Sequence, residues 1–270
     1  MIVDYPYFYF RTFTFIMKSL KPLLIVVLCF VTYNLSAQSP RQIKKDLLQS
    51  FGEIDCWNAQ KSTDSTGEVY DSLARANDNF SRKLKYYAEK YPFTIAENFP
   101  MDGLSRTSSD GLLKIYSWDT HTAGTQHTFK SVIQYKTGER TIAMIDTSRG
   151  GYNYNKLYML TVGNKVYYLA TYYGILSLYT RGEGIRIFTI ENGKLTDKVK
   201  LIKTKSGLTD KLYYTYDQHL ANSDIMSEIT LVYDPKAKTI TFPIVAENMW
   251  ITDNYITYKF TGQYFERVKN

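Results

Sequence analysis

The chain has 270 residues, of which 44% are hydrophobic and 16% aromatic, and it contains 25 tyrosines. This is enough for one large domain or two small ones with an ample core. The formal net charge is +7 at pH 7, but lysine and arginine are scattered along the chain, which excludes a nucleic-acid-binding footprint.

The first predicted element is a signal peptide over residues 17–37. Lys18 and Lys21 form a short basic start, followed by the apolar run "LLIVVLCFV" at residues 23–31, which is too short to span a membrane. The segment ends in the small residue Ala37, which suits signal peptidase. We therefore expect cleavage after Ala37, export to the periplasm or the cell exterior, and no membrane span in the mature chain.

Two other interpretations of this segment stay open. An uncleaved membrane anchor results if the apolar run extends to Leu35. A lipid anchor on Cys29 is disfavoured, because lipidation signals want a small residue before the cysteine and Leu28 precedes it. Residues 1–16 do not fit the start of a signal peptide, so we interpret them as an upstream extension that arises from a wrong start site, with Met17 as the true start.

The expected mature chain is a single domain over residues 38–270, which is 233 residues. The removed segment carries three basic residues and one acidic residue, so the formal net charge falls from +7 to +5. Cys56 is the one cysteine left, which excludes an intramolecular disulfide. Its position beside Trp57, near the end of a predicted helix, indicates a buried free thiol rather than a nucleophile.

Residues 38–92 are predicted to be helical. Ser39 is expected to cap the first helix, with Pro40 in its first turn. Apolar residues then recur at helical spacing, namely Ile43, Leu47, Phe51 and Ile54 in the first helix and Val69, Leu73, Ala76, Phe80, Leu84, Tyr87 and Tyr91 in the second. Pro92 ends the second helix. We expect the two helices to form a hairpin that packs against the rest of the domain.

Residues 104–270 are predicted to form a β meander, since the hydrophobic period changes to two near Leu112. Five hairpins are indicated by turn residues: Thr137-Gly138, Gly163-Asn164, Asn192-Gly193, Asp234-Pro235 and Gly262. Ten or more strands follow. The predicted fold class is α+β, mainly antiparallel β, as a sandwich, an open barrel or a bent sheet.

A β-propeller is less favoured. The stretch "SSDGLLKIYSWDT" at residues 108–120 is similar to a propeller blade, but no second copy occurs at the expected period. The layout as a whole, with its "DG…IYSWDT…IQYK" segment and final "YKFTGQYF", resembles a group of uncharacterised exported proteins of Gram-negative bacteria that contain a domain of unknown function. This resemblance implies no activity.

The strongest candidate site lies in "YSWDTHTAGTQHTF" at residues 116–129. In an extended backbone Asp119 and His121 share a face, and His127 on the returning strand can meet them. An Asp and two His can hold Zn²⁺ or Fe²⁺, and with Trp118 they can also line a ligand site. The alternative is a hairpin loop in which Asp119 and the threonines bond the backbone. His219 lies in a separate polar loop.

Carboxylate pairs for glycoside hydrolysis are a second possibility. Six acidic residues lie near predicted strand ends: Asp110, Asp119, Asp146, Glu183, Asp217 and Glu247. The chain has no P-loop, nucleophile-elbow or dinucleotide motif, and no cofactor is predicted. The Gly-rich "RGEGIR" at residues 181–186 precedes a predicted strand, and we interpret it as a turn flanked by charge.

Adjacent tyrosines in "NKVYYLATYYG" and "KLYYTYD" point to opposite faces of their strands. We expect one of each pair in the core and the other exposed or covered by the helices, where it can stack on sugar rings; ordinary cross-strand packing is the alternative. The resulting prediction is a non-catalytic exported module that binds a small molecule, a glycan or an envelope protein. The alternative is a metal-dependent or carboxylate-based hydrolase with its site near Asp119, His121 and His127.

Overall fold

The computed structural model describes residues 39–64, 67–91, 104–148, 151–218 and 230–268. By its internal contacts the chain divides into Met1–Ile43 and Lys44–Asn270, and the second unit carries every described strand. The predicted extension and signal peptide at residues 1–37, and His219, lie outside the described residues. Within the described part, no helix is both long and apolar enough to cross a membrane.

The two predicted helices are present as α2 (Pro40–Gln60) and α3 (Gly67–Lys90). The expected cap is confirmed, because the Ser39 hydroxyl accepts a hydrogen bond of 3.2 Å from the Gln42 backbone N–H. The apolar stripe of α3 is buried as its spacing indicated. Its buried apolar side chains are Val69, Leu73, Ala76, Phe80, Leu84, Tyr87 and Ala88.

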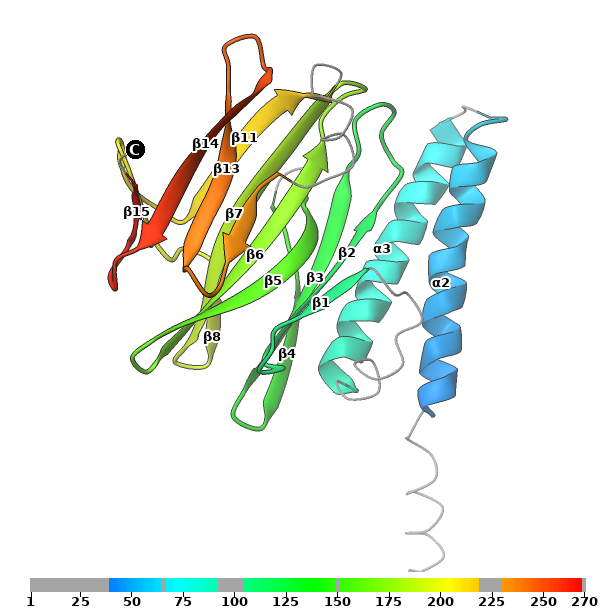
Figure 1. Ribbon diagram of the computed structural model, residues 1–270. Coiled ribbons are helices and arrows are strands. Elements are labelled where there is room, and N and C mark those ends of the chain that lie inside the picture. Colours follow the sequence, from blue (N-terminus) through cyan, green and yellow to red (C-terminus); the bar gives the residue numbers. More distant parts are fainter. Residues whose placement is uncertain (1–38, 65–66, 92–103, 149–150, 219–229, 269–270) are drawn as a thin grey trace, which may run out of the picture. The chain divides into compact units, whose positions relative to one another are not determined.

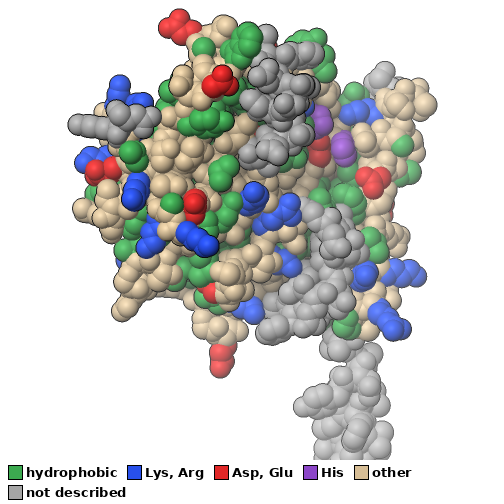
Figure 2. Space-filling model, in the orientation of Figure 1, with side chains coloured by type: hydrophobic (Ala, Val, Ile, Leu, Met, Phe, Trp, Pro, Cys, Tyr) green, Lys and Arg blue, Asp and Glu red, His purple; other side chains and the backbone are tan. Residues whose placement is uncertain are grey.

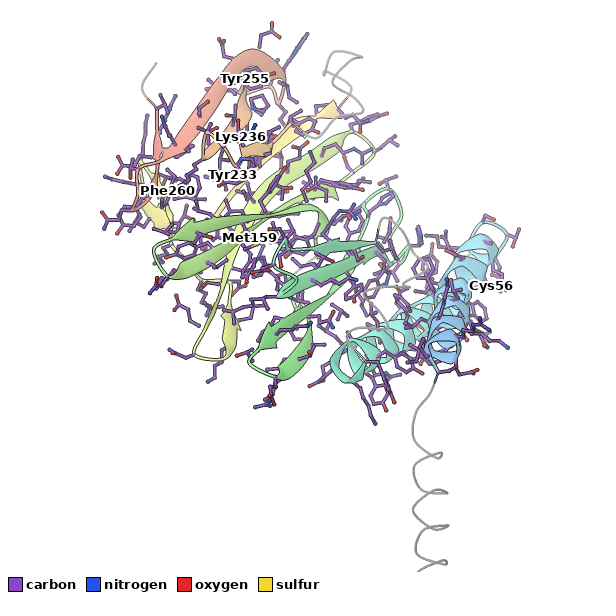
Figure 3. All side chains as sticks on the ribbon, turned by 60° about the horizontal axis from the view of Figure 1, so that its bottom comes forward. Cys56, Met159, Tyr233, Lys236, Tyr255 and Phe260 are labelled. Atoms are coloured by element: carbon purple, nitrogen blue, oxygen red, sulfur yellow. The ribbon has the colours of Figure 1, made fainter. Side chains whose placement is uncertain are left out.

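The prediction that Cys56 is buried is wrong. Its side chain is exposed on α2 (Figure 3). The reason is helical geometry, since Cys56 lies two residues after the buried Ile54 and is therefore turned about 200° away from it around the helix.

The described residues form fifteen strands. They are β1 (Ser105–Thr107), β2 (Leu113–Asp119), β3 (Phe129–Thr137), β4 (Arg140–Ile145), β5 (Asn153–Val162), β6 (Lys165–Ile175), β7 (Thr180–Glu191), β8 (Lys194–Thr196), β9 (Ile202–Thr204), β10 (Gly207–Thr209), β11 (Lys211–Asp217), β12 (Val232–Asp234), β13 (Thr239–Val245), β14 (Ile251–Phe260) and β15 (Phe265–Arg267). The five predicted hairpins are β3–β4, β5–β6, β7–β8, β12–β13 and β14–β15.

Three open sheets result. Sheet A has the order β1-β2-β3-β4, sheet B the order β11-β7-β6-β5 with β8 also on β7, and sheet C the order β10-β9-β15-β14-β13-β12. Described pairs are antiparallel except β15 with β9. The prediction of an α+β, mainly antiparallel fold is confirmed at this level.

Sheet B is covered on both faces. One face shares a hydrophobic cluster with sheet C, which includes Leu169 and Ile187 of sheet B and Tyr233 and Phe265 of sheet C. The other face shares a second cluster with sheet A. Helix α3 contacts β3 and β4, and Figure 1 shows the order α3, sheet A, sheet B, sheet C.

This layering changes the expectation for the paired tyrosines. Tyr168 and Tyr172 of β6 are buried against sheet A. Tyr167, which points the other way, packs against the cluster shared with sheet C. In this pair the second tyrosine is therefore covered by another sheet, and not by the helices. In the pair Tyr213 and Tyr214 of β11, Tyr214 packs against the same cluster and Tyr213 is exposed, as expected.

Candidate functional site

Residues 116–129 form the β2–β3 hairpin. Asp119 ends β2 and pairs with Phe129, the first residue of β3, so residues 120–128 are the connection. The Thr120 backbone N–H donates to the Thr128 carbonyl at 2.8 Å and closes the base of this connection. The interpretation as strand, connection and strand is confirmed.

Trp118 is not available to a ligand. Its side chain is only 1% exposed and its ring lies edge-on against Phe80 of α3, with 4.9 Å between ring centroids. The indole N–H donates to the Asn77 side-chain oxygen at 3.0 Å, and the Asn77 amide donates to the Thr120 carbonyl at 2.9 Å. The structure therefore places Trp118 between sheet A and α3.

Asp119, His121 and His127 do converge at the surface. Asp119 Oδ2 contacts His127 Nδ1, and Asp119 Oδ1 accepts a hydrogen bond of 2.9 Å from the His121 backbone N–H. His121 has a φ of 55° and its Nδ1 lies 3.8 Å from Asp119 Oδ1. Lys61 Nζ donates to the carbonyls of His121 and Ala123 at 2.6 and 3.1 Å. Figure 2 shows the two described histidines in purple beside an acidic side chain in red.

These contacts favour an anchored loop over a metal centre. The described residues contain no group of three His, Cys, Asp or Glu that could hold a metal ion. Both carboxylate oxygens of Asp119 face donors of its own loop. What the arrangement provides instead is a carboxylate that orients one imidazole.

His127 lines a cleft between sheets A and B, with a volume of about 400 Å³. We call it the aromatic cleft. Its lining residues are Gln126, His127, Phe129, Gly151, Tyr152, Tyr172, Gly174, Leu176, Lys211 and Tyr213. The His127 backbone N–H donates to the Ile175 carbonyl at 2.9 Å, which ties the β2–β3 connection to the end of β6.

Two stacked tyrosines form one wall of the cleft. Tyr172 of β6 and Tyr213 of β11 both pair with Gly184 of β7, which lies between them. Their rings stack at 6.2 Å with an interplanar angle of 14°. A Cβ on Gly182 would lie 2.2 Å from the Tyr213 hydroxyl, and one on Gly184 would lie 2.4 Å from the Tyr172 hydroxyl. The glycines thus make the room in which the rings lie flat on the sheet.

The interpretation of "RGEGIR" as a turn is wrong. These residues lie within β7, and Glu183 and Arg186 are buried. Glycines inside a strand commonly mark a close approach of other groups, and here the approaching groups are tyrosine rings from neighbouring strands. That signal was present in the sequence, but the identity of the partner rings was not.

Substituting Gly184 with alanine is expected to lower the free energy of unfolding by about 2 kcal/mol, because the new methyl group also meets the Leu212 carbonyl at 2.6 Å, and backbone cannot move aside cheaply. The matched control is Gly174→Ala in β6, where the nearest atom is Leu176 Cδ2 at 4.0 Å. Urea unfolding of both variants checks this. Equal midpoints for the two would contradict the role given to Gly184.

A buried ionic network lies against Tyr152, another lining residue, whose ring contacts Tyr172 with 4.1 Å between ring centroids. The Arg186 guanidinium lies 5.2 Å from the centre of the Tyr152 ring. Its Nη1 is 2.7 Å from Asp146 Oδ2 and also contacts the Tyr154 hydroxyl. Its Nη2 contacts Asp197. Tyr152 is therefore held from behind by a cation whose charge is already balanced by carboxylates.

Three of the predicted carboxylates, Asp110, Asp146 and Glu183, are bonded by groups of the fold itself. Asp110 accepts from the Tyr168 hydroxyl at 2.9 Å, and Asp146 pairs with Arg186. Glu183 accepts from two tyrosine hydroxyls, and Glu247 is exposed. The Asp217 backbone N–H donates to the Met249 carbonyl. No acidic side chain is among the described residues that line the aromatic cleft.

Of the four predicted site residues, His127 lines the cleft. Asp119 contacts His127 but, like His121, is not among the lining residues, and Trp118 packs against α3. No family model matches the chain, and neither a curated protein nor a solved structure matches it.

Proposed function

We propose that this protein is an exported, non-catalytic module that binds a glycan in the aromatic cleft. Four aromatic rings and a few polar groups, Gln126, His127 and Lys211, line the cleft. Concave, mostly apolar sites with a few placed polar groups are the usual form of small-ligand sites, which measure about 300–1,000 Å³. A volume of about 400 Å³ is at the small end of this range and suits a short glycan segment.

The observation that carries the proposal is the exposed face of Tyr213. Its side chain is 47% exposed although the ring is stacked on Tyr172 and backed by Gly182. A flat, immobilised aromatic face beside hydrogen-bonding groups suits a sugar ring, which is apolar on its faces and polar at its edge. Burial raises the pKa of both phenols, so both remain neutral.

Tyr213→Ala is expected to weaken glycan binding tenfold or more, about 1.4 kcal/mol, since truncation removes the stacking face. Binding would be measured on a glycan array and then by calorimetry with the best oligosaccharide. The control is Tyr255→Ala, which removes a similarly exposed tyrosine (51%) from β14 of sheet C (Figure 3). Equal loss in both variants, or no binding by the unmodified protein, would contradict the proposal.

A second candidate, a hydrolase, is favoured by the Asp119–His127 contact on the cleft wall. A carboxylate that orients an imidazole is one way to build a general base. No acidic residue is among the described residues that line the cleft, and the described residues contain no metal-ligand group. Assays with nitrophenyl glycosides and esters, together with metal analysis, test this candidate. Turnover that is lost in His127→Ala but kept in His121→Ala would replace the binding role.

Export and the fine layout of the domain belong to the same proposal. The basic and apolar residues of 17–37 support a cleaved signal peptide, and N-terminal sequencing of the exported protein is expected to start at Gln38. A start at Met17 would overturn cleavage.

We also propose that α2 and α3 form the predicted helical hairpin. Its helix α3 packs against sheet A, and sheet A includes the β2–β3 hairpin whose connection carries His127.

A further inference from the structure

His127 is fixed through both its backbone and its side chain. Its backbone N–H is bonded to the Ile175 carbonyl, and its ring Nδ1 contacts Asp119 Oδ2. Asp119 is itself fixed, because its second oxygen accepts from the His121 backbone N–H at 2.9 Å. The Phe129 ring lies 6.3 Å from the imidazole. The imidazole orientation is therefore determined before any ligand arrives.

The proton on this imidazole can be assigned from its partner. An ionised carboxylate only accepts hydrogen bonds, so Nδ1 must carry the hydrogen that it shares with Asp119. In the neutral imidazole, Nε2 is then a lone-pair acceptor. The His127 side chain is 38% exposed and lines the aromatic cleft, and no described residue hydrogen-bonds Nε2.

We propose that Nε2 of His127 is a preset hydrogen-bond acceptor that selects glycans by one hydroxyl group, while the sugar ring stacks on Tyr213. This inference rests on the proposed function and adds the feature that the ligand must present. A site built to bond a hydroxyl discriminates strongly against an analogue that lacks it, because the polar group of the site is left unpaired. The matching ligand is thus a sugar with a free hydroxyl at the edge that faces His127.

The tautomer is tested first, on the free protein, by nitrogen-15 NMR of the histidine rings. The expected spectrum shows a protonated Nδ1 and an unprotonated Nε2 for His127. In Asp119→Asn the carbonyl oxygen is expected to stay on the His121 N–H, so that the new NH₂ group faces Nδ1. Nε2 should then carry the proton and become a donor. A protonated Nε2 in the unmodified protein at neutral pH overturns the inference, whether or not glycans bind.

Binding is tested with the oligosaccharide that gives the strongest array signal. His127→Ala is expected to weaken binding tenfold or more. His127→Gln should restore most of it, because the glutamine carbonyl can reach the position of Nε2. Asp119→Asn should weaken binding in the unmodified background but add nothing in the His127→Gln background, as a double-mutant cycle would show. His121→Gln, on the same loop but outside the cleft lining, is the matched control.

The outcomes separate this inference from the proposal on which it rests. Unchanged binding in His127→Ala, together with loss in Tyr213→Ala, overturns the role of His127 and leaves glycan binding intact. A deoxy analogue that binds as tightly as the parent sugar, whichever hydroxyl is removed, also overturns it. Absence of oligosaccharide binding by the unmodified protein overturns both.

Discussion

Replacing Glu183 with alanine is expected to lower the free energy of unfolding by roughly 3–5 kcal/mol. Glu183 is only 2% exposed, and its carboxylate accepts hydrogen bonds from the hydroxyls of Tyr214 and Tyr216 at 3.0 and 2.9 Å. It also accepts from the backbone N–H groups of Thr230 and Leu231, both at 2.8 Å. The Thr230 hydroxyl also lies within hydrogen-bonding distance, at 3.2 Å. One side chain of sheet B is thus bonded by two tyrosines of β11 and by the two residues that precede β12 of sheet C.

The large effect follows from what the substitution leaves behind. Burial, followed by the Glu183 charge, raises the pKa of Tyr214 and Tyr216, so both hydroxyls stay protonated and need an acceptor. Without the carboxylate, the Tyr216 hydroxyl and the backbone N–H groups of Thr230 and Leu231 lose their acceptor, whereas the Tyr214 hydroxyl keeps its contact with the Thr230 hydroxyl. The free energy of unfolding of Glu183→Gln should lie between that of the unmodified protein and that of Glu183→Ala. The amide offers one accepting oxygen but turns its NH₂ group toward the remaining donors.

Urea unfolding followed by tryptophan fluorescence measures this order. The control is Glu247→Ala, which removes an exposed glutamate from the β13–β14 connection and is expected to change the free energy of unfolding by less than about 0.5 kcal/mol. If Glu183→Ala unfolded at the same urea concentration as Glu247→Ala, Glu183 would not connect the two sheets in the way described.

The local elements of this fold could be predicted because their signals are local. A Gly163-Asn164 pair between two alternating segments defines a hairpin without knowledge of the rest of the chain, and Gly163 has the positive φ that such a turn requires. In the same way, apolar residues at helical spacing followed by Pro92 were enough to delimit α3.

The assignment of strands to sheets could not be predicted, because it depends on contacts between distant residues. β7 pairs with β6, β8 and β11, and both of its faces are buried. A strand of this kind loses the alternation that marks a half-exposed strand. Gly182 and Gly184 then resemble turn residues in the sequence. In the structure they make room for the rings of Tyr172 and Tyr213, which come from other strands.

The candidate site shows the same limit. The spacing of Asp119, at the end of one strand, and His127, close to the start of the next, was enough to expect them together, and Asp119 does contact His127. Nothing in that spacing indicated that His127 would also line an aromatic cleft together with residues of β6 and β11. Trp118 was grouped with them by sequence proximity alone, but strand alternation turns it to the opposite face of sheet A.

Replacing Arg186 with methionine is expected to cost about 3–5 kcal/mol at neutral pH, because it leaves the carboxylate of Asp146 buried without its cation. Methionine keeps most of the packing of the arginine stem, so the loss reports mainly the charge. Asp146→Asn in the same chain should recover part of this loss, about 2 kcal/mol, since the neutral amide needs no counter-charge. Urea unfolding of the two single variants and the double variant gives the coupling.

The pH dependence identifies Asp146 as the group responsible. Burial alone would raise the pKa of Asp146, but the Arg186 charge and the hydrogen bonds from Ser148 and Arg186 outweigh it, so the pKa lies below its ordinary value. A lowered pKa gives stability that is present above the unfolded-state pKa of about 4 and is lost as the pH falls through the folded-state pKa.

In Arg186→Met the interactions with the guanidinium that lower the pKa of Asp146 are gone and burial dominates, so Asp146 protonates at higher pH. The stability difference between the two proteins should therefore be largest near pH 7 and should shrink as the pH falls below about 5. A difference that stays constant over this range would show that the loss comes from packing against Tyr152 and Phe188, and not from the charge pair.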